Sequence, residues 1–373
     1  MVGNRVRILS GIEEIAREDW NALALHGAPI LDWEYICALE KSGSVSQEKG
    51  YRPSHMAVYD GSRPVLIAPL YERDRAWVEF GDGGLIEFLT ELTGLPFHSG
   101  LVGSIPFTPI PGYDFLHSND NPDLLKAYRY LLRQIDELCT DRGLSTSRIY
   151  FVAPDSPLHA VLSENGYTSL TSVHLQWLNR GYHSFEDYLG TFKSSRRTKI
   201  KREWRSVHDQ GIELEWVKGT EATEAHYEDM HLLYRRTWTK HMGFGIRPFL
   251  NQSFFKMLGE NFRHRSSFSV SSMRGKPVAM ALFYHKRDTM YGRYWGCFRE
   301  MPFLHFATCY YFPIAYGISN GIRSMDPGFG GEHKYIRGFE SSPVSHYIKF
   351  YDEKQRRIAH AVLEQMRDQL VLK

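Results

Sequence analysis

The stretch DPGFGGEHKYIRGFE, residues 326–340, combines a cluster of glycines with titratable side chains. Gly330 and Gly331 predict a turn with positive φ, whose backbone N–H groups can point at an anion or at a developing oxyanion. Glu332 and His333 follow directly, and either side chain could act as a general base. We therefore expect a catalytic or anion-binding loop here, with a charged surface loop as the alternative.

Two cations in the same stretch could hold a negatively charged ligand. Lys334 and Arg337 are suited to a carboxylate or a phosphate. We include Lys334 with Glu332 and His333 among the candidate catalytic residues, and Arg337 among the candidate binding residues. No metal is expected here, because the Glu332–His333 pair lacks partners at ligand spacing.

A predicted strand upstream of this stretch carries aromatic and cationic residues. In MYGRYWG, residues 290–296, alternation places Tyr291, Arg293 and Trp295 on one face. Such a face either packs around a stacked, structural cation or lines a ligand groove. We take Arg293, Tyr294 and Trp295 as candidates for substrate binding.

His305 lies at the predicted start of the next helix, residues 304–320. It is a candidate catalytic residue, and a packed or capping histidine is the structural alternative. Pro313 falls inside the helical pattern, so we expect a kink or a broken first turn in this helix.

The segment FKSSRRTKIKREWR, residues 192–205, is strongly basic, and Glu203 is its one acid. Its seven cations are Lys193, Arg196, Arg197, Lys199, Lys201, Arg202 and Arg205. On the predicted helix 194–211 these cations repel one another unless an anion binds. Candidate anions are a coenzyme phosphate, the phosphates of a tRNA acceptor stem and an anionic membrane, and a solvated surface is the alternative. We take Lys193, Arg196 and Arg197 as candidate binding residues.

These segments belong to a chain of alternating helices and strands. Residues 54–74 read as a hairpin, residues 121–143 as a helix and residues 267–296 as three consecutive strands. In both halves, predicted helices are followed by antiparallel strands. This order predicts an α/β fold, in which layers of helices and strands form an α+β arrangement around a mixed sheet.

Composition excludes several classes of protein. A chain of 373 residues suggests two domains. A formal charge of +2 does not indicate a DNA-binding protein. The four cysteines are far apart, which favours a reducing cytoplasm over a disulfide framework. No apolar run is long enough to predict a membrane span, although attachment to a membrane surface stays open.

The sequence also lacks the commonest catalytic motifs. It contains no Walker-type loop, no GxGxxG after a strand, no GxSxG elbow and no HExxH. The usual nucleotide-binding, hydrolase and metalloprotease interpretations are therefore removed.

Three blocks, FKSSRRTKIKREWR, YGRYWGCF…FLHFATCYY and PGFGGEHKYIRGF, resemble the signature blocks of FemAB-like proteins. This is a bacterial family of N-acyltransferases with tandem GNAT folds, of the peptidoglycan biosynthesis or recognition type, to which some bacterial ceramide synthases look related. CALEKSGSV, GYRPSHMAVYDG and PFTPIPG extend the resemblance, so that it spans residues 35 to 350 or so.

The resemblance implies two GNAT-like domains, an N-terminal one over residues 1–180 and a C-terminal one over residues 181–373 with the active groove. It implies transfer of an acyl group to an amine, with acyl-CoA or aminoacyl-tRNA as co-substrate and no permanently bound cofactor. Glu332 or His333 would take the amine proton, and N–H groups near Gly330 and Gly331 would stabilise the oxyanion.

We expect an N-acyltransferase that joins an acyl-CoA-type thioester to an amine acceptor, such as a long-chain or lipid amine. Near-neutral charge favours CoA over tRNA, because a tRNA needs a broad basic surface. One alternative is an aminoacyl-tRNA-dependent transferase acting on a peptidoglycan precursor or peptide.

The other alternative is a non-catalytic module that binds a cell-wall or lipid ligand. It depends on the segment CFREMPFLHF, which lacks the glycines of the usual GNAT pyrophosphate loop. The expected location is the cytoplasm, either free or as a peripheral protein at the inner membrane.

Overall fold

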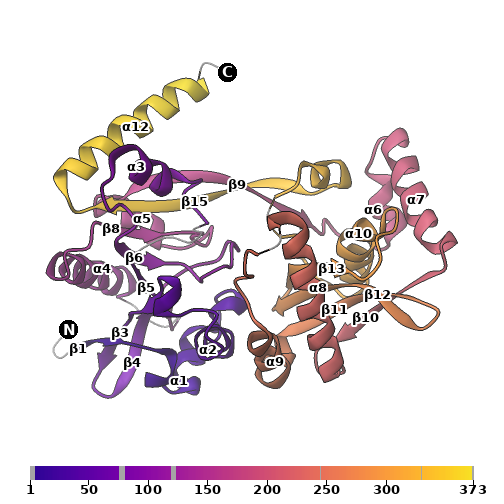
Figure 1. Ribbon diagram of the computed structural model, residues 1–373, viewed down its shortest axis with the longest axis horizontal. Helices are drawn as coiled ribbons and strands as arrows, with labels where there is room; N and C mark the ends of the chain where they lie inside the picture. Colours follow the sequence, from indigo (N-terminus) through magenta and orange to yellow (C-terminus); the bar gives the residue numbers. More distant parts are fainter. Residues whose placement is uncertain (1–4, 75–79, 119–122, 244, 329, 372–373) are drawn as a thin grey trace. The chain divides into compact units, whose positions relative to one another are not determined.

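The computed structural model describes residues 5–74, 80–118, 123–243, 245–328 and 330–371. The chain forms two compact units. Unit 1 consists of Met1–Glu40, Val45–Ser172 and Pro343–Lys373, and unit 2 consists of Lys41–Ser44 and Val173–Ser342. Helices and sheets occur in both units (Figure 1), which confirms the predicted mixed α/β class.

Unit 1 contains two groups of paired strands. One sheet has the order β1-β3-β4-β7, and the other strands pair in the order β15-β8-β6-β5-β2. The strands are β1 Arg5–Leu9, β2 Arg52–Pro53, β3 His55–Asp60, β4 Arg63–Ala68, β5 Tyr71–Arg73, β6 Gly100–Gly103, β7 Leu116–His117, β8 Thr146–Ile149 and β15 Glu340–Phe350. The helices are α1 Arg17–Leu23, α2 Trp33–Lys41, α3 Leu85–Thr93, α4 Leu124–Asp141, α5 Leu158–Glu164 and α12 Glu353–Val371. The hairpin predicted over 54–74 is β3 with β4, and the helix predicted over 121–143 is α4.

The C-terminal residues belong to the core of unit 1. Tyr347–Phe350 of β15 pair antiparallel with β8. Ile348 and Leu363, on β15 and α12, are buried in one cluster with Leu85 and Leu89 of α3. The family resemblance implied that residues 343–373 belong to the second domain, whereas these contacts place them in unit 1.

Unit 2 contains the segments with candidate functional residues. Its strands are β10 Ile212–Lys218, β11 Ser266–Met273, β12 Lys276–Lys286, β13 Thr289–Cys297 and β14 Ser324–Asp326, and β9 Thr168–Leu178 enters it from unit 1. Its helices are α6 Phe185–Gly190, α7 Ser194–Asp209, α8 Glu224–Met242, α9 Gln252–Asn261, α10 Leu304–Phe306 and α11 Phe312–Ser319, with a π-helical segment Ala307–Tyr311 and a 3-10 helix Glu332–Arg337, η6.

The strands of unit 2 pair in the order β10-β11-β12-β13-β14-β9. Strands β10 to β13 are antiparallel, as the three consecutive strands predicted over 267–296 require, and β13 pairs with β14 in parallel. Helices α8 and α9 cover one face, where Tyr294 of β13 packs against Tyr234 and Phe255 at ring distances of 5.3 and 5.5 Å. The other face forms a core with α6, α7, the π-helical segment and α11.

The basic helix α7 packs against this core through one face. Ile200, Glu203 and Val207 are its buried residues, at the spacing of one helix face, and Trp204 is partly buried beside them. The helix is followed by Gly211, whose φ of 73° suits a glycine just after a helix end. An acid on the buried face requires a partner, since an unpaired buried carboxylate is costly.

Candidate functional site

A groove of about 1370 Å³ opens in unit 2 beside β13. It is lined by α8, by β12 and β13, by the start of the helical region at 304–310 and by the loop after β14. Of the predicted site residues, the groove gathers Arg293, Tyr294, Trp295, His305, Gly330, Gly331, His333 and Lys334.

The groove forms where two parallel strands separate. Pairing of β14 with β13 covers only Thr289–Tyr291, because β14 ends at Asp326, directly before Pro327 and Gly328. Farther along β13, residues 292–295 and Cys297 border the groove.

A β-bulge interrupts the pairing of β13 with β12. Leu282 pairs with Tyr294 and Phe283 pairs with Gly292, so that Arg293 is an extra residue between two paired ones. The bulge interrupts the predicted alternation, and four consecutive residues, Gly292 to Trp295, line the groove.

The π-helical segment Ala307–Tyr311 supplies two tyrosines to different surroundings. Pro313 is the second residue of α11, and because proline has no N–H it cannot continue the regular α-helical bonding; the predicted break occurs here. Tyr310 lines the groove, whereas Tyr311 lines a second, smaller pocket. Single-turn π-helical insertions often accompany functional sites.

His333, Tyr310 and His305 form a cluster in the groove. The Tyr310 hydroxyl lies 3.0 Å from Nε2 of His333, and the two histidine rings are 5.8 Å apart. Burial lowers the pKa of His333, and the charges of Lys334 and Arg337 lower it further. Burial, together with His333, Lys334 and Arg337, lowers the pKa of His305 to about 3. Both imidazoles are therefore neutral at pH 7.

Lys334 is buried beside the same cluster, with its side chain 3% exposed. Its Nζ donates to the carbonyl oxygen of Gly328 at 2.7 Å. Burial lowers the pKa of Lys334 to about 8, against the opposing effect of the Asp326 carboxylate. Asp326 itself lies 2.8 Å from Nε2 of His174 and accepts from the N–H of Gly328.

The glycines of the loop have specific reasons to be glycine. Gly330 and Gly331 have φ values of 73° and 93°, as predicted for this turn. A Cβ at Gly331 would lie 2.5 Å from the His333 ring, so the imidazole packs directly over this residue. The loop backbone and His333 are therefore placed together.

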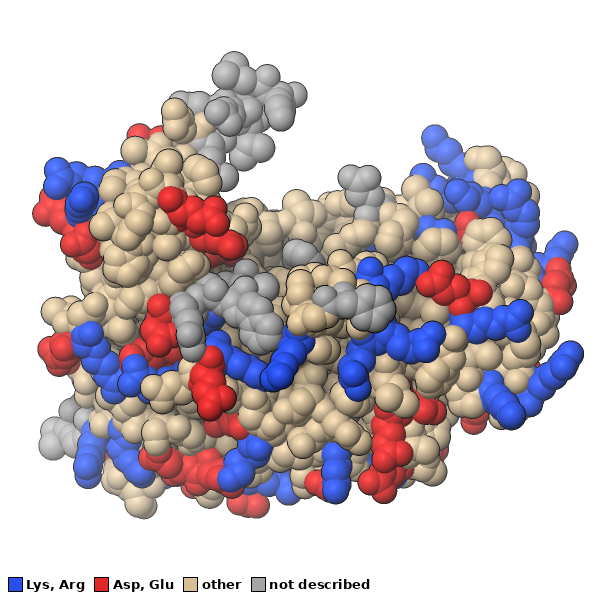
Figure 2. Space-filling model, viewed as in Figure 1, with Lys and Arg blue, Asp and Glu red and all other residues tan. Residues whose placement is uncertain are grey.

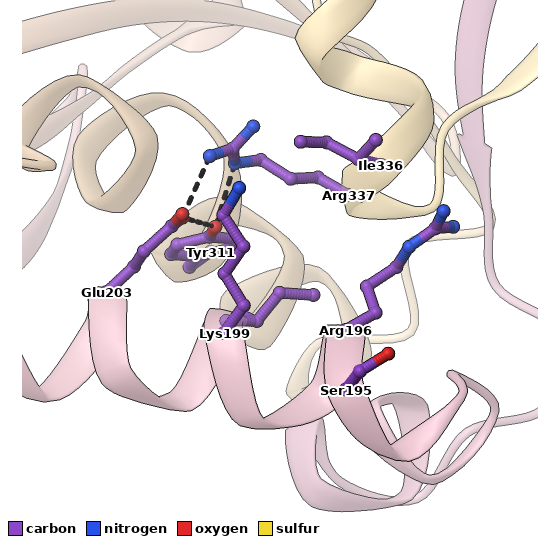
Figure 3. A pocket seen from close by; sticks show the side chains of 8 residues that line it. Ser195, Arg196, Lys199, Glu203, Tyr311, Ile336 and Arg337 are labelled. Carbon is purple, nitrogen blue, oxygen red and sulfur yellow. Dashed lines mark hydrogen bonds and ion pairs between the residues drawn. The ribbon is translucent and has the colours of Figure 1, made fainter.

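Arg337, predicted to bind a negatively charged ligand, is instead buried in an ion pair within the protein. Its guanidinium is buried and pairs with Glu203 of α7 at 2.8 Å (Figure 3). Nε donates to the Tyr311 hydroxyl at 2.8 Å, and the Tyr311 hydroxyl in turn donates to Glu203. The guanidinium carbon lies 3.4 Å from the centre of the Phe306 ring. Arg337 thus joins α7, the π-helical segment and η6.

The remaining predicted residues lie outside the groove lining. Arg196 borders the smaller pocket, whereas Lys193 precedes α7 and is exposed, and Arg197 is half-buried. Figure 2 shows Lys and Arg side chains gathered over the region of α6 and α7. The side chain of Glu332 lies outside the described part of the structure, so its role stays a prediction.

Sequence reasoning missed Glu203, Tyr310 and Tyr311 as members of these clusters. The signal for Glu203 was present, since a single acid among seven cations is unusual. No local pattern marks the two tyrosines, because the π-helical segment changes which way each one points.

Two features are absent from the described residues. None of their helices is both long and apolar enough to cross a membrane. No group of three or more metal-ligating side chains occurs among them.

A family model named FemAB-like, described as peptidoglycan biosynthesis/recognition, matches residues 11–372. Among solved structures, FemX is similar with a TM-score of 0.54 at 11% identity, over 92% of this chain and 98% of that one. A conserved protein of unknown function from Bacteroides thetaiotaomicron gives 0.53 at 10% identity, over 92% and 99% of the two chains. L-PGS from Bacillus licheniformis gives 0.53 at 9% identity, over 94% and 96%. These likenesses show a shared fold, and no curated protein matches the sequence.

Proposed function

Because the chain belongs to the FemAB-like family, as its sequence blocks predicted, we propose that it is a transferase that moves an acyl or aminoacyl group onto an amine. The observation that carries the proposal is the cluster of His333, Tyr310 and Lys334 in a groove large enough for an extended donor. Together they offer a neutral base, a hydroxyl and a cation within one site.

Among the candidate bases, His333 is best suited to proton transfer. A pKa below its ordinary value keeps its imidazole neutral at pH 7, so it can accept a proton. A pKa of about 3 makes His305 too weak a base to hold one at that pH. We assign His305 to shaping the groove, where its ring packs 4.9 Å from that of Trp295.

We propose a reaction that uses these groups in turn. The acceptor amine attacks the donor carbonyl, and the Tyr310 hydroxyl takes the amine proton while passing its own to His333. The Lys334 cation and the N–H groups near Gly330 and Gly331 stabilise the oxyanion, an effect worth about 3–4 kcal/mol per donor. Collapse of the intermediate forms the amide and breaks the thioester or ester bond, and the leaving group takes up the proton.

For the donor we propose an acyl-CoA-type thioester and, for the acceptor, a long-chain or lipid amine. Cations at the groove, Arg235, Arg236 and Lys240, are placed to meet donor phosphates, and Glu300 pairs with Lys240. The exposed cations of α7 offer donor phosphates a second place to bind, and they also favour a second candidate, an aminoacyl-tRNA donor with a peptidoglycan precursor as acceptor.

Two assays test these proposals. We expect amide formation from a panel of acyl-CoA thioesters and amines, and no loss of product when a lysate is treated with RNase. RNase-sensitive product formation would replace the thioester donor by aminoacyl-tRNA. If the protein binds a ligand but transfers no group from either donor, it is a non-catalytic binding module.

We expect kcat to show a bell-shaped dependence on pH. Activity rises as His333 loses its proton below pH 6.5, and falls through about pH 8 as Lys334 loses its charge. Lys334→Arg removes the alkaline fall, because arginine stays charged. Initial rates at saturating substrates between pH 5 and pH 9.5 measure both limbs. A wild-type plateau that continues to pH 9.5 contradicts the role of Lys334.

Replacing two cations of α7 should weaken use of a phosphorylated donor. We expect Arg196→Ala with Arg197→Ala to lower kcat/KM for acyl-CoA about tenfold, equivalent to about 1.4 kcal/mol. For a simple thioester without phosphates, kcat/KM should be the same in the variant and in the wild-type protein. The matched control is Arg202→Ala with Arg205→Ala, which changes the same charge on the same helix. An equal loss for both pairs, or for both thioesters, counts against a specific phosphate contact.

A further inference from the structure

A second pocket, which we call the α7 pocket, lies between α7 and η6. It has a volume of about 300 Å³. Its lining residues are Ser195, Arg196, Lys199, Ile200, Glu203, Tyr311, Ile336 and Arg337. In Figure 3, Arg196 and Lys199 extend from α7 toward the η6 segment, which carries Arg337. Three cations therefore share a small cavity with one carboxylate, which leaves an excess of positive charge for an anion.

The buried guanidinium of Arg337 has hydrogen-bonding capacity left. Of its five N–H donors, Nε–H binds Tyr311, one binds Glu203 and one binds the carbonyl oxygen of His333. Two N–H groups remain that no hydrogen bond in the described residues uses. A buried guanidinium that borders a cationic pocket with donors to spare is suited to share a phosphate oxygen.

Arg337 also connects this pocket to the groove. Its Nη1 lies 2.8 Å from the carbonyl oxygen of His333, the residue whose imidazole lines the groove. The Tyr188 hydroxyl donates to the carbonyl oxygen of Arg337 at 2.6 Å and anchors the far end of η6. A change at the guanidinium is therefore transmitted through one hydrogen bond to the backbone that carries His333.

We propose that a phosphate group bound in the α7 pocket completes the hydrogen bonding of Arg337 and thereby sets the position and charge environment of His333. Arg337 is in this view a positioning residue that links an anion on α7 to the groove. The inference deepens the proposed function, because it concerns the regulation of the same site.

The sign of the effect on His333 follows from the groups around it. His305 and Tyr310 contact its ring, and burial together with the charges of Lys334 and Arg337 holds its pKa down. A phosphate beside Arg337 offsets that positive field. The pKa of His333 should therefore rise when the α7 pocket is filled.

The experiment follows the His333 imidazole by NMR in full-length protein with ¹³C-labelled histidine, assigned by its loss in His333→Gln. We expect pyrophosphate to shift this resonance and to raise its midpoint in a pH titration. Lys199→Ala should abolish the rise, whereas Arg202→Ala, on the same helix but outside the pocket lining, should keep it. A rise that is equal in Lys199→Ala places the anion in the groove and overturns the proposal.

A second variant tests the route through Arg337. Glu203→Met with Arg337→Met removes both buried charges together, so the variant keeps its charge balance. In this variant we expect pyrophosphate to leave the titration of His333 unchanged. A rise as large as in the wild-type protein shows that the pocket acts without Arg337 and contradicts the proposal.

Further probes distinguish the sources of the phosphate. Free coenzyme A and phosphatidylglycerol vesicles are used in turn in place of pyrophosphate. The probe that raises the titration midpoint of His333 as pyrophosphate does identifies the source of the phosphate. The readout does not require turnover. If His333→Gln is fully active but the wild-type titration responds to pyrophosphate, the assignment of the base fails while the coupling stands.

Discussion

His333→Gln should lower kcat by about 10²–10⁴-fold at pH 7, the usual contribution of a general base. Glutamine can donate and accept hydrogen bonds but cannot take up the proton of the attacking amine. The Tyr310 hydroxyl, 3.0 Å from Nε2, would lose its proton acceptor with the same substitution. Steady-state rates with saturating thioester and amine measure the effect.

The matched control for this variant is His183→Gln, which removes an exposed imidazole of the same unit. We expect its kcat to equal that of the wild-type protein, and both variants to keep the wild-type melting temperature. Tyr310→Phe should give an intermediate loss, since water can replace the relay in part. Full turnover by His333→Gln, with the fold intact, would show that another group takes the proton, and Glu332 is the next candidate.

The second large effect concerns stability. Glu203→Gln and Arg337→Met should each lower the free energy of unfolding by about 3–5 kcal/mol, because each leaves one buried charge without its partner. The two side chains are 2% and 3% exposed, so the charge that remains is poorly solvated. Urea denaturation followed by tryptophan fluorescence gives the values.

The double variant Glu203→Met with Arg337→Met is the control for this prediction. Replacing a whole buried ion pair by apolar side chains is often neutral. We therefore expect the double variant to lie close to the wild type, with a coupling between the two positions of several kcal/mol. Additive losses would mean that the two charges do not depend on each other.

The arrangement of elements in unit 2 could be predicted because local patterns determine it. Helix α7 and strands β11 to β13 occur where periodicity and turn residues place them. The positive φ of Gly330 and Gly331 also follows from residue type, since few other residues adopt it. His333 and Lys334 follow this glycine turn directly in the sequence.

Contacts between distant segments could not be predicted in this way. Arg337 was predicted to bind a ligand, yet its guanidinium pairs with the side chains of Glu203, 134 residues away, and Tyr311. Pairing of this kind depends on how α7 packs against η6, which no single segment encodes. The cost of burying Glu203 is offset only in the folded unit.

The strand bulge and the π-helical segment show a second limit. Each inserts one residue into a regular pattern, so side chains after it face a new direction. Strict alternation on β13 puts Arg293 and Tyr294 on opposite faces, whereas both were candidates for substrate binding and both line the groove. Pro313 signalled a break in its helix, but not where Tyr310 and Tyr311 would then point.

The return of residues 343–373 to unit 1 has a consequence for the order of folding. Apart from residues 41–44, unit 2 is one continuous segment, and it is synthesised before the last strand and helix of unit 1 exist. Since domains fold as units during synthesis, the unit with the groove can reach its structure on the ribosome while the N-terminal part of the chain still lacks β15 and α12. Unit 1 must keep its apolar surfaces from aggregating throughout that delay, and completion of the C-terminus is the step that closes its core.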